Sequence, residues 1–582
     1  MAEATYPYQD PSLDPQQRAA DLLTRLDLED KAGLMFQTMA SYGPLGESTA
    51  IFGLPSLQSM IEKRRLNHFN LIGSLNSGRE MAEWHNAAQD LAAQVGIGLP
   101  ITFSTDPRHG FTDNPGAAML AGPFSQWPET LGLAAIADAA VVESFADIMR
   151  QEYVAVGIRL ALHPQIDLST EPRWARCNGT FGEDAELSSK LGVAYIRGLQ
   201  GEALGPESVA AMTKHFPGGG PQKDGEDPHF EYGKDQVYPG GQFGYHLKPF
   251  IAAIAAGTSQ IMPYYGRPVG TEYEEVGFGF NKGVLTDLLR NELGFTGIIC
   301  TDWGLLTDAE LFGAPFPARA WGVEQLSRDE RIIKALDAGV DQFGGEMCSS
   351  ALVELVRAGR VSEARLDQSV LRLLTEKFRL GLFENRHVAA ETASIIVGCE
   401  AFRDAGLAAQ RASVTLLHNN GQLPLSEGIT VYAEGVNPTA LDGVAQVVDS
   451  PEQAAVILVR LKAPFDERGT GFESFFHAGS LEFPAETIAH LTELAAIAPV
   501  VVDVYLDRPA IIAPLVAAAA ALTVTYGTSD FAWVDVLFGK DQPQGKLPFD
   551  IPSSMAAVVA SRSDVPFDTE NPTFRFGDGL SY

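Results

Sequence analysis

Short apolar segments alternate with amphipathic stretches through about the first 345 residues of the chain. In the stretch that contains Val141, Phe145, Ile148 and Glu152, apolar side chains recur with the spacing of one helix face. Other segments are short, apolar and bounded by turn residues, as strands are, and they cover residues 69–75, 97–105, 159–166, 209–213, 260–262, 296–301 and 339–343. Strands that alternate with helices in this way predict parallel β-α-β units.

The number of these units predicts a closed barrel. Seven strand segments, with an eighth that is hidden or irregular, match an α/β fold of the (β/α)8 TIM-like type better than a short doubly wound sheet. In such a barrel the carboxyl ends of all strands share one face. Polar residues that follow the strands would therefore meet there, and they are Asp106, Asp167, Lys214, His215, Tyr264, Tyr265, Asp302 and Asp341.

A second, smaller domain is predicted after the barrel. We expect the barrel in residues 1–385, a linker in 386–400 and the second domain in 401–582. In that last part, helical patterns such as 486–496 separate strand patterns at 430–433, 456–461, 500–505 and 522–526, which predicts a three-layer α/β sandwich. The uncharged stretch 509–529 is interpreted as a buried helix that leads into a strand, and not as a membrane span.

The composition is that of a folded protein, and the charge restricts its partners. Hydrophobic residues make up 45% of the chain and charged residues 20%, which lies in the normal globular range. The formal net charge of −32 opposes binding to nucleic acid or to an anionic membrane surface. A neutral small molecule is therefore the expected partner. The first 20 residues lack a basic segment followed by an apolar one, from which we expect a cytoplasmic location.

No cofactor and no metal site are predicted. The cysteines Cys177, Cys300, Cys348 and Cys399 show no CxxC spacing and are expected to be free thiols. The histidines are scattered and lack an HExxH pattern. The glycines that follow Lys214 do not form a phosphate-binding loop, because in that motif the lysine comes after the glycines. A Gly-rich loop here would instead let the backbone approach a ligand whose hydroxyls bind Lys214 and His215.

Several segments together resemble one known family over nearly the whole chain. They are KHFPGGG (214–220) with DPH (227–229), GFTGIICTDWG (294–304), LLHNNGQLPL (416–425), GKLPFDIP (545–552) and FRFGDGLSY (574–582). Their sequence and order are similar to those of the family 3 glycoside hydrolases, of the β-glucosidase and exo-β-glucanase type. The resemblance implies a (β/α)8-like barrel, then an α/β sandwich, with the active site between them. It also implies a retaining, exo-acting β-glycoside hydrolase, most specifically a β-glucosidase that removes terminal glucose.

Retaining hydrolysis needs two carboxylates, one to attack the anomeric carbon and one to protonate the departing oxygen. Asp302 matches the family nucleophile and would carry the covalent glycosyl intermediate. Two glutamates compete as the proton donor, Glu473 by its spacing to Leu481 and Glu467 by a PYxE-like context. We expect Glu473, since its aromatic neighbours would favour the protonated carboxyl.

Asp227 and His229 offer a third proton donor, because the loop resembles that of the β-N-acetylhexosaminidase branch. Gly219 stands where that branch has histidine, and the loop is longer, so His229 is expected to bind substrate or to order the loop. A hexosaminidase or a phosphorolytic relative is therefore the alternative enzyme. A non-enzymatic carbohydrate-binding protein is disfavoured, because Asp302 is present.

The resemblance also implies which side chains hold the terminal sugar. They are Asp106, Arg176, Lys214, His215, His229, Tyr265 and Trp303. Trp303 would offer an apolar platform beside the sugar ring. A Gly-Gly-Trp-Thr motif, which supplies a second tryptophan in plant exo-glucanase relatives, is absent between residues 425 and 456. Short oligosaccharides or aryl glycosides are therefore expected substrates, and assembly as a homodimer is left open.

Overall fold

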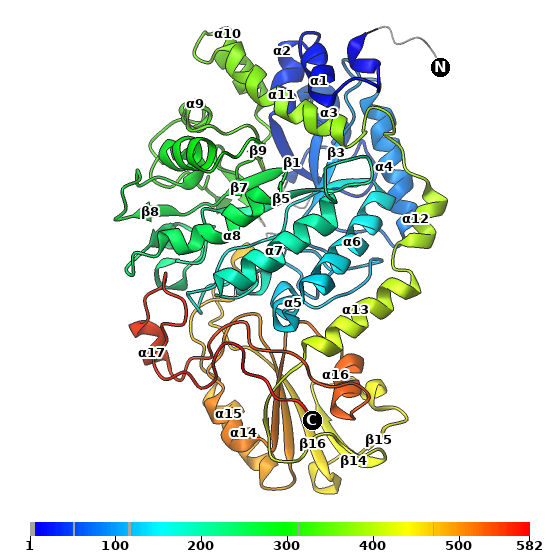
Figure 1. The fold of residues 1–582 in the computed structure, drawn as a ribbon, viewed down its shortest axis with the longest axis vertical. Helices are drawn as coiled ribbons and strands as arrows, with labels where there is room; N and C mark the ends of the chain where they lie inside the picture. The colour runs from blue at the N-terminus through cyan, green and yellow to red at the C-terminus, as the bar shows by residue number, and fades with distance from the viewer. Residues whose placement is uncertain (1–5, 50–52, 115–117, 312–313, 470) are drawn as a thin grey trace.

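The computed structural model describes residues 6–49, 53–114, 118–311, 314–469 and 471–582. It has two domains, the larger one from blue to green in Figure 1 and the smaller one, mostly yellow to red, below it. The two domains expected from the sequence are thus both present, a barrel and a separate sheet domain.

The first domain is a parallel barrel. Its strand order is β12-β1-β2-β3-β4-β5-β7-β9, and a parallel bridge between Cys300 and Gln342 joins the two ends of this sheet. The strand missing from the sequence pattern is β1, which confirms the hidden eighth strand. The bounds are β1 (Phe36–Ser41), β2 (His68–Ile72), β3 (Thr102–Thr105), β4 (Ile158–Ala161), β5 (Ala210–Phe216), β7 (Gln260–Pro263), β9 (Ile298–Ile299) and β12 (Phe343–Gly344).

Amphipathic helices cover the barrel. In α6 (Ala139–Val156), the Asp138 side chain caps the first turn by accepting from the Ala140 N–H, and Phe145 is buried. The helix ends at Gly157, whose φ of 86° and close approach to a histidine ring leave no room for a side chain. The other helices of this domain are α1 (Pro15–Leu23), α2 (Leu28–Leu34), α3 (Leu57–Arg64), α4 (Gly78–Ala92), α5 (Thr130–Ile136), α7 (Ala185–Gln200), α8 (Phe243–Ala255), α9 (Arg328–Ala338), α10 (Ser349–Arg357), α11 (Glu363–Arg379) and a π-helix (Gly283–Glu292).

Two small two-stranded sheets lie outside the barrel sheet. One joins β6 (Asp235–Val237) to β8 (Arg267–Val269), and the other is a hairpin of β10 (Ala309–Leu311) and β11 (Ala314–Phe316) that follows β9. The segment predicted as a linker contains α12 (Ala390–Ile396), which packs against α4 and α6, and α13 (Glu400–Ser413) follows it. The domain boundaries stay a prediction.

The second domain is built on a six-stranded sheet with helices on both sides. Its order is β13-β18-β17-β16-β14-β15, and β13 is antiparallel to the parallel remainder. The strands are β13 (Thr415–Asn419), β14 (Ile429–Glu434), β15 (Ala445–Val447), β16 (Val456–Lys462), β17 (Val500–Tyr505) and β18 (Ala521–Thr525). The helices are α14 (Ala485–Ala495), α15 (Ala513–Ala518), α16 (Asp530–Leu537) and α17 (Met555–Ala560), and a short 3-10 turn covers Gly471–Phe475.

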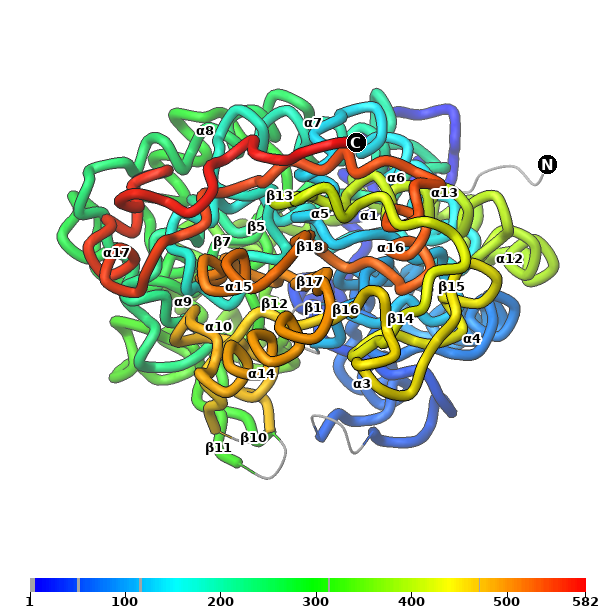
Figure 2. The backbone as a smooth tube through the Cα atoms, turned by 90° about the horizontal axis from the view of Figure 1, so that it is seen from below, coloured from blue at the N-terminus to red at the C-terminus, as the bar shows by residue number. Residues whose placement is uncertain are grey.

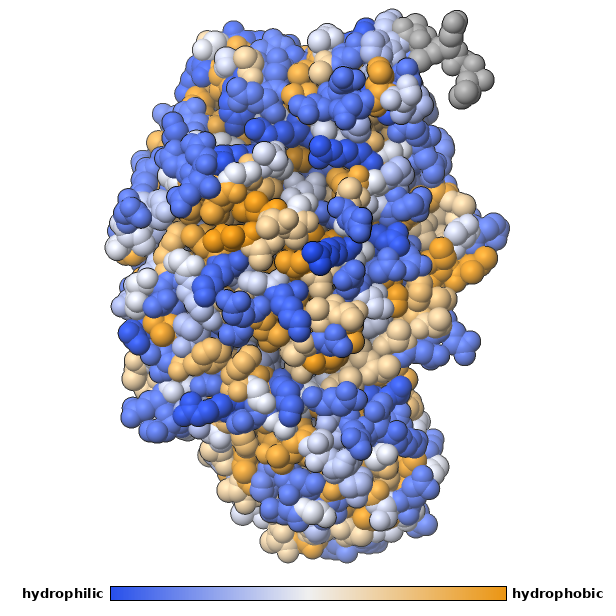
Figure 3. All heavy atoms as spheres, viewed as in Figure 1, coloured by the Kyte–Doolittle hydropathy of each residue, from blue (hydrophilic) through white to orange (hydrophobic). Residues whose placement is uncertain are grey.

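The stretch 509–529 forms α15 and then β18, as interpreted from the sequence. Among the described residues, no helix combines the length and the apolar character needed to cross a bilayer. On the face drawn in Figure 3, hydrophilic residues spread over both domains, and the outline narrows where the larger domain meets the smaller one.

The second domain covers one end of the barrel, where Figures 1 and 2 both place its sheet. Buried hydrogen bonds join the two domains. The Glu183 carboxylate accepts the backbone N–H groups of Asp550 at 2.7 Å and Phe567 at 2.8 Å. Arg508 donates to the Arg173 carbonyl at 3.0 Å. These hydrogen bonds give partners to polar groups that domain docking removes from water.

The prediction for Asp341 is wrong. This aspartate lies at the amino end of β12, where its carboxylate accepts the Ile299 N–H at 3.0 Å and pairs with Arg290 and Arg372. Strand β12 begins only at Phe343, at the end of the segment 339–343 in which it was predicted. Asp341 therefore precedes the strand and does not follow it. Its carboxylate therefore links the π-helix, through Arg290, and α11, through Arg372, to the amino end of β12.

Candidate active site

A cavity of about 430 Å³ lies at the carboxyl ends of the barrel strands. Its wall includes the barrel residues predicted as the nucleophile and the sugar-binding groups, namely Asp106, Arg176, Lys214, His215, His229, Tyr265, Asp302 and Trp303, whereas Asp227 is not part of this wall. They come from strand β5 and from the segments that follow β3, β4, β5, β7 and β9, which are far apart in the sequence. Barrel closure therefore brings these side chains together, while their individual roles stay predictions.

Asp302 has one engaged and one free carboxylate oxygen. Its Oδ1 accepts the Trp303 N–H at 2.8 Å, and this contact fixes the side chain next to its strand. The residue is only 7% exposed, and its Oδ2 is buried without a hydrogen-bond partner. His215 Nε2 lies 3.8 Å from Oδ2, beyond hydrogen-bond distance. A buried carboxylate oxygen without a partner in a cavity is suited to nucleophilic attack on a bound ligand.

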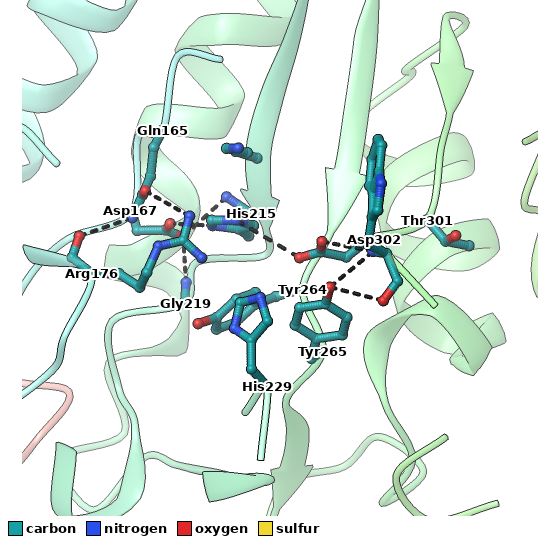
Figure 4. A network of polar contacts seen from close by, with 12 residues as sticks. Gln165, Asp167, Arg176, His215, Gly219, His229, Tyr264, Tyr265, Thr301 and Asp302 are labelled. Carbon is teal, nitrogen blue, oxygen red and sulfur yellow. Dashed lines mark hydrogen bonds and ion pairs between the residues drawn. The ribbon is translucent and has the colours of Figure 1, made fainter. Parts of the chain in front are cut away.

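His215 is oriented by a second aspartate. Asp167 accepts from His215 Nδ1 at 2.7 Å and from the His215 backbone N–H at 3.1 Å, and Gly219 N–H also donates to it (Figure 4). Burial, with a contribution from Arg176, holds the pKa of His215 well below its ordinary value. The ring is therefore neutral with its proton on Nδ1, and Nε2 is left as an acceptor that faces Asp302.

Lys214 and Asp106 form a buried ion pair in the cavity wall. Lys214 Nζ lies 2.9 Å from Asp106 Oδ1, and Asn70 Nδ2 donates to Oδ2 at 3.0 Å. Burial alone would raise the pKa of Asp106, but the charge and hydrogen bond of Lys214 hold it below its ordinary value. Asp106 is therefore ionised at neutral pH, and the pair offers both an acceptor and a donor to sugar hydroxyls.

Arg176, from the segment that follows β4, is part of the cavity wall. Its guanidinium donates to Gln165 Oε1 at 3.3 Å, and Gln165 Nε2 donates back to the Arg176 carbonyl at 3.2 Å. This reciprocal contact fixes the arginine in a buried position among several acidic side chains. A guanidinium held in this way presents fixed donors to a ligand.

His229 is held by Asp227 two residues earlier. Asp227 Oδ1 lies 2.6 Å from His229 Nδ1, while Trp174 Nε1 and the Tyr264 hydroxyl both donate to Oδ2 at 3.2 Å. Burial would raise the pKa of Asp227, but His229 and the hydrogen bonds lower it to about 2. The aspartate is therefore ionised, and the pair has the geometry of an oriented histidine at the cavity wall.

Tyr265 and Trp303 form the wall behind Asp302. The Tyr265 hydroxyl accepts the Trp303 N–H and donates to the Trp303 carbonyl, both at 2.9 Å. Burial, with the charge of Asp302 next, raises the pKa of Tyr265 well above its ordinary value, so the phenol keeps its proton. Arg319 stacks on Phe316 with its guanidinium carbon 4.1 Å from the ring centroid.

Glu473 does not line the cavity in the described part of the chain. Its carboxylate accepts the Tyr232 hydroxyl at 2.5 Å, while its neighbour Phe472 lies in the cavity wall. Phe472 packs against Phe316 with ring centroids 5.2 Å apart. Glu467 is exposed, and it too is outside the described cavity wall. The structure thus brings the 3-10 turn of the second domain to the cavity edge without pointing either glutamate inward.

Several cavity residues were not singled out from the sequence. Asn70 carried a signal, since it is a polar residue inside the apolar segment 69–75 and its amide holds Asp106. Arg319, Phe316 and Phe472 carried no local signal, because only the folding of the β10–β11 hairpin and the docking of the second domain bring them to the cavity. Within the described residues, no cluster of three or more metal-binding side chains occurs.

The fold and this cavity define a class of enzyme. A carboxylate with a free oxygen at a barrel strand end, beside an indole and a ring of buried hydroxyl-binding groups, is suited to glycosidic bond cleavage. Figure 4 shows how Asp302, His215 and Tyr265 converge there from different strands.

Comparison with known proteins gives the family. The chain belongs to glycosyl hydrolase family 3: the N-terminal domain profile of the family matches residues 55–376, and the C-terminal domain profile matches residues 404–582. It is therefore a glycoside hydrolase.

The relatives cover almost the whole chain. This chain is 52% identical to "Probable beta-glucosidase C" of Aspergillus flavus, over 99% of this chain and 92% of that protein. It is 41% identical to "Periplasmic beta-glucosidase/beta-xylosidase" of Dickeya chrysanthemi, over 99% of this chain and 91% of that protein. The fold is similar to a solved b-glucosidase from Erythrobacter marinus, with a TM-score of 0.80 at 21% identity, over 100% of this chain and 84% of that one.

Proposed function

We propose that this chain is a retaining, exo-acting β-glucosidase that releases non-reducing terminal β-D-glucose from short oligosaccharides or aryl glycosides. The observation that carries the proposal is the free Oδ2 of Asp302 in a cavity where Lys214, His215 and His229 are already oriented by aspartates. The names of the relatives from Aspergillus flavus and Dickeya chrysanthemi support glucoside as the substrate.

The proposed reaction has two steps. Asp302 Oδ2 attacks the anomeric carbon, the bond to the departing oxygen breaks, and a proton donor supplies the proton of the leaving alcohol. Water then attacks the same carbon, its proton passes back to the donor residue, and the bond to Asp302 breaks. Asp106, Lys214 and His215 would hold hydroxyls of the sugar during both steps, since a substrate without those hydroxyls leaves buried groups unpaired.

Glu473 is the proposed proton donor. Support comes from its place on the turn that Phe472 anchors at the cavity edge. Reaching the glycosidic oxygen requires the Glu473 side chain to turn from Tyr232 toward the cavity. His229 is the competing donor, because its ring already lies in the cavity wall with Asp227 behind it.

Leaving-group dependence separates these donors. Glu473→Ala should reduce turnover of aryl glucosides with poor leaving groups far more than that of substrates with excellent ones, since only the former need protonation. Added azide should restore turnover of the activated substrates. If Glu473→Ala slows both substrates equally while His229→Ala shows the leaving-group dependence, the proton donor is His229.

Substrate choice tests the proposed specificity. Rates are measured on aryl β-glucoside, β-xyloside and β-N-acetylglucosaminide, with and without inorganic phosphate. A preference for the glucoside, unchanged by phosphate, is expected. Preference for the acetylated sugar, or acceleration by phosphate, would establish the hexosaminidase or phosphorolytic alternative in its place.

The nucleophile has its own test. Asp302→Ala should abolish turnover of every glycoside while the unfolding transition stays close to that of the parent. Turnover comparable with the parent would refute the role of Asp302. Intact mass analysis of the parent with a slowly deglycosylated fluoro-glycoside should show one added glycosyl group, which Asp302→Ala prevents.

Location and assembly complete the proposal. A cytoplasmic location is supported by the four cysteines, which are all free thiols, as is usual in a reducing compartment. Cell fractionation tests it. Light scattering of the purified chain separates a monomer from the homodimer that the sequence left open.

A further inference from the structure

A second and larger cavity lies between the two domains. It has a volume of about 690 Å³, and we call it the rear cavity; Thr112 and Gln165 of the barrel and Gly435, Lys462, Asp507 and Thr528 of the second domain are part of its wall. Arg176 and Lys214 line both this cavity and the catalytic one. The two spaces are therefore back to back, with these two cationic side chains between them.

The rear cavity lies where a parallel α/β sheet normally binds its ligand. In the second domain, β14 pairs with β15 on one side and β16 on the other, so the chain changes direction across the sheet at this point. Open parallel sheets bind ligands outside the carboxyl ends of their strands at such a reversal. Gly435 directly follows β14, and Lys462 ends β16, and both line the cavity.

The close fit of the loop after β14 is consistent with a built site. Gly435 has a φ of 71°, and a Cβ there would lie 2.6 Å from the Arg460 carbonyl oxygen. Only glycine lets this loop pass so near the end of β16. The wall of the cavity is thus a defined backbone arrangement at the strand ends.

Three basic side chains of the rear-cavity wall, Arg460, His477 and Lys214, are paired with aspartates of the protein. Arg460 pairs with Asp503 at 2.9 Å and with Asp530 at 2.6 Å. His477 Nδ1 lies 2.5 Å from Asp507 Oδ2, and Lys214 pairs with Asp106 at 2.9 Å. A charged ligand would have to compete with these pairs and lose its hydration as well. A neutral ligand avoids both costs.

Two buried polar atoms of the wall have no partner. They are Asp507 Oδ1 and the hydroxyl of Thr528, a residue that is 6% exposed. A buried polar atom without a partner costs free energy that a ligand hydroxyl can recover. Phe111 and Tyr505 add aromatic surface to the same wall. Free hydrogen-bonding atoms beside aromatic rings are suited to a ligand with hydroxyl groups on a compact saturated ring, such as the pyranose ring of a sugar.

We propose that the rear cavity is a second carbohydrate-binding site, at the strand reversal of the second domain, for a neutral sugar. The site does not depend on hydrolysis, and it is separate from the cavity that contains Asp302. A sugar bound there contacts the same Arg176 and Lys214 that face the catalytic cavity, so its occupancy is linked to substrate binding through these two side chains.

The test counts labelled D-glucose bound per chain by equilibrium dialysis of the whole protein. Ser474, an exposed residue of the rear-cavity wall, is changed to tryptophan to fill the space, and Ser426→Trp on an exposed loop outside the wall is the matched control. The parent and Ser426→Trp should bind one glucose more per chain than Ser474→Trp. Equal binding by Ser474→Trp and Ser426→Trp would overturn the proposal.

A second variant keeps the shape of the cavity. Thr528→Val removes only the free hydroxyl, and the affinity of one of the two glucose sites should fall about fivefold to tenfold, as for one lost hydrogen bond. Thr492→Val, on the exposed face of α14, is the control and should leave both affinities unchanged. Unchanged affinities in Thr528→Val would contradict the assignment of this wall to the site.

Charged sugars test the class of ligand. D-glucuronate and D-glucosamine should not occupy the site that Ser474→Trp removes, because a charged sugar would have to compete with the ion pairs of Arg460, His477 and Lys214 and lose its hydration. Binding of either at the affinity of D-glucose would refute the preference for a neutral sugar.

Discussion

Replacing Lys214 by methionine isolates the electrostatics of the catalytic cavity. The substitution keeps the length of the side chain and removes its charge, so that Asp106 retains only the Asn70 hydrogen bond and is 7% exposed. Loss of one partner from a buried ion pair costs about 3–5 kcal/mol. The free energy of unfolding should fall by that amount at pH 7.

The loss should depend on pH in a defined direction. In the parent, the pKa of Asp106 is lowered, so the pair adds stability above the unfolded pKa of about 4 that is lost as the pH falls through the folded value. In Lys214→Met, the Asn70 hydrogen bond and the charge of Arg176 remain, but burial is the largest influence and should raise that pKa. The folded state then takes up a proton, and stability falls as the pH rises. The difference between variant and parent should therefore grow from pH 4 to pH 7.

Urea unfolding followed by tryptophan fluorescence at both pH values measures this difference. Lys334→Met is the matched control, because Lys334 pairs with Glu274 at 2.8 Å on the surface, and it should cost less than about 1 kcal/mol. The double variant Lys214→Met with Asp106→Asn should recover much of the lost stability. A loss below about 1 kcal/mol for Lys214→Met, equal at pH 4 and pH 7, would refute a desolvated pair.

Three further changes test other parts of the structure. Tyr265→Phe removes the hydroxyl that holds both backbone groups of Trp303 behind the nucleophile, and kcat should fall about tenfold, measured on an aryl glucoside; an unchanged kcat would deny this positioning role. Burial raises the pKa of Glu183 to about 8, so the stability of the parent should fall as the pH rises from about 4.5 to 8, by at most about 5 kcal/mol, and urea unfolding of Glu183→Gln should show a smaller decline. Phe472→Ala removes the ring packed on Phe316 at the cavity edge, and KM for aryl glucosides should rise about tenfold; an unaltered KM would place the leaving group elsewhere.

The sequence carried enough local information for most of the barrel. The apolar segments 69–75, 97–105, 159–166, 209–213, 260–262 and 296–301 contain the strands β2, β3, β4, β5, β7 and β9 or overlap them. The strand β1 was not located from the sequence, because its residues Phe36–Ser41 mix polar and apolar positions and closely follow a helix. Segment 339–343 gave the right strand but the wrong end, and Asp341 was misplaced as a result.

The amino-acid sequence by itself determined the family, the two-domain fold and the barrel residues that meet around Asp302, because strand ends and motifs are local in the chain. Tertiary structure alone decided three things: Glu473 turns to Tyr232, Phe316 and Phe472 meet, and Arg176 and Lys214 separate two cavities. These depend on how the second domain docks on the barrel. Docking is set by contacts between residues hundreds of positions apart, which no local pattern of hydrophobic and polar residues encodes.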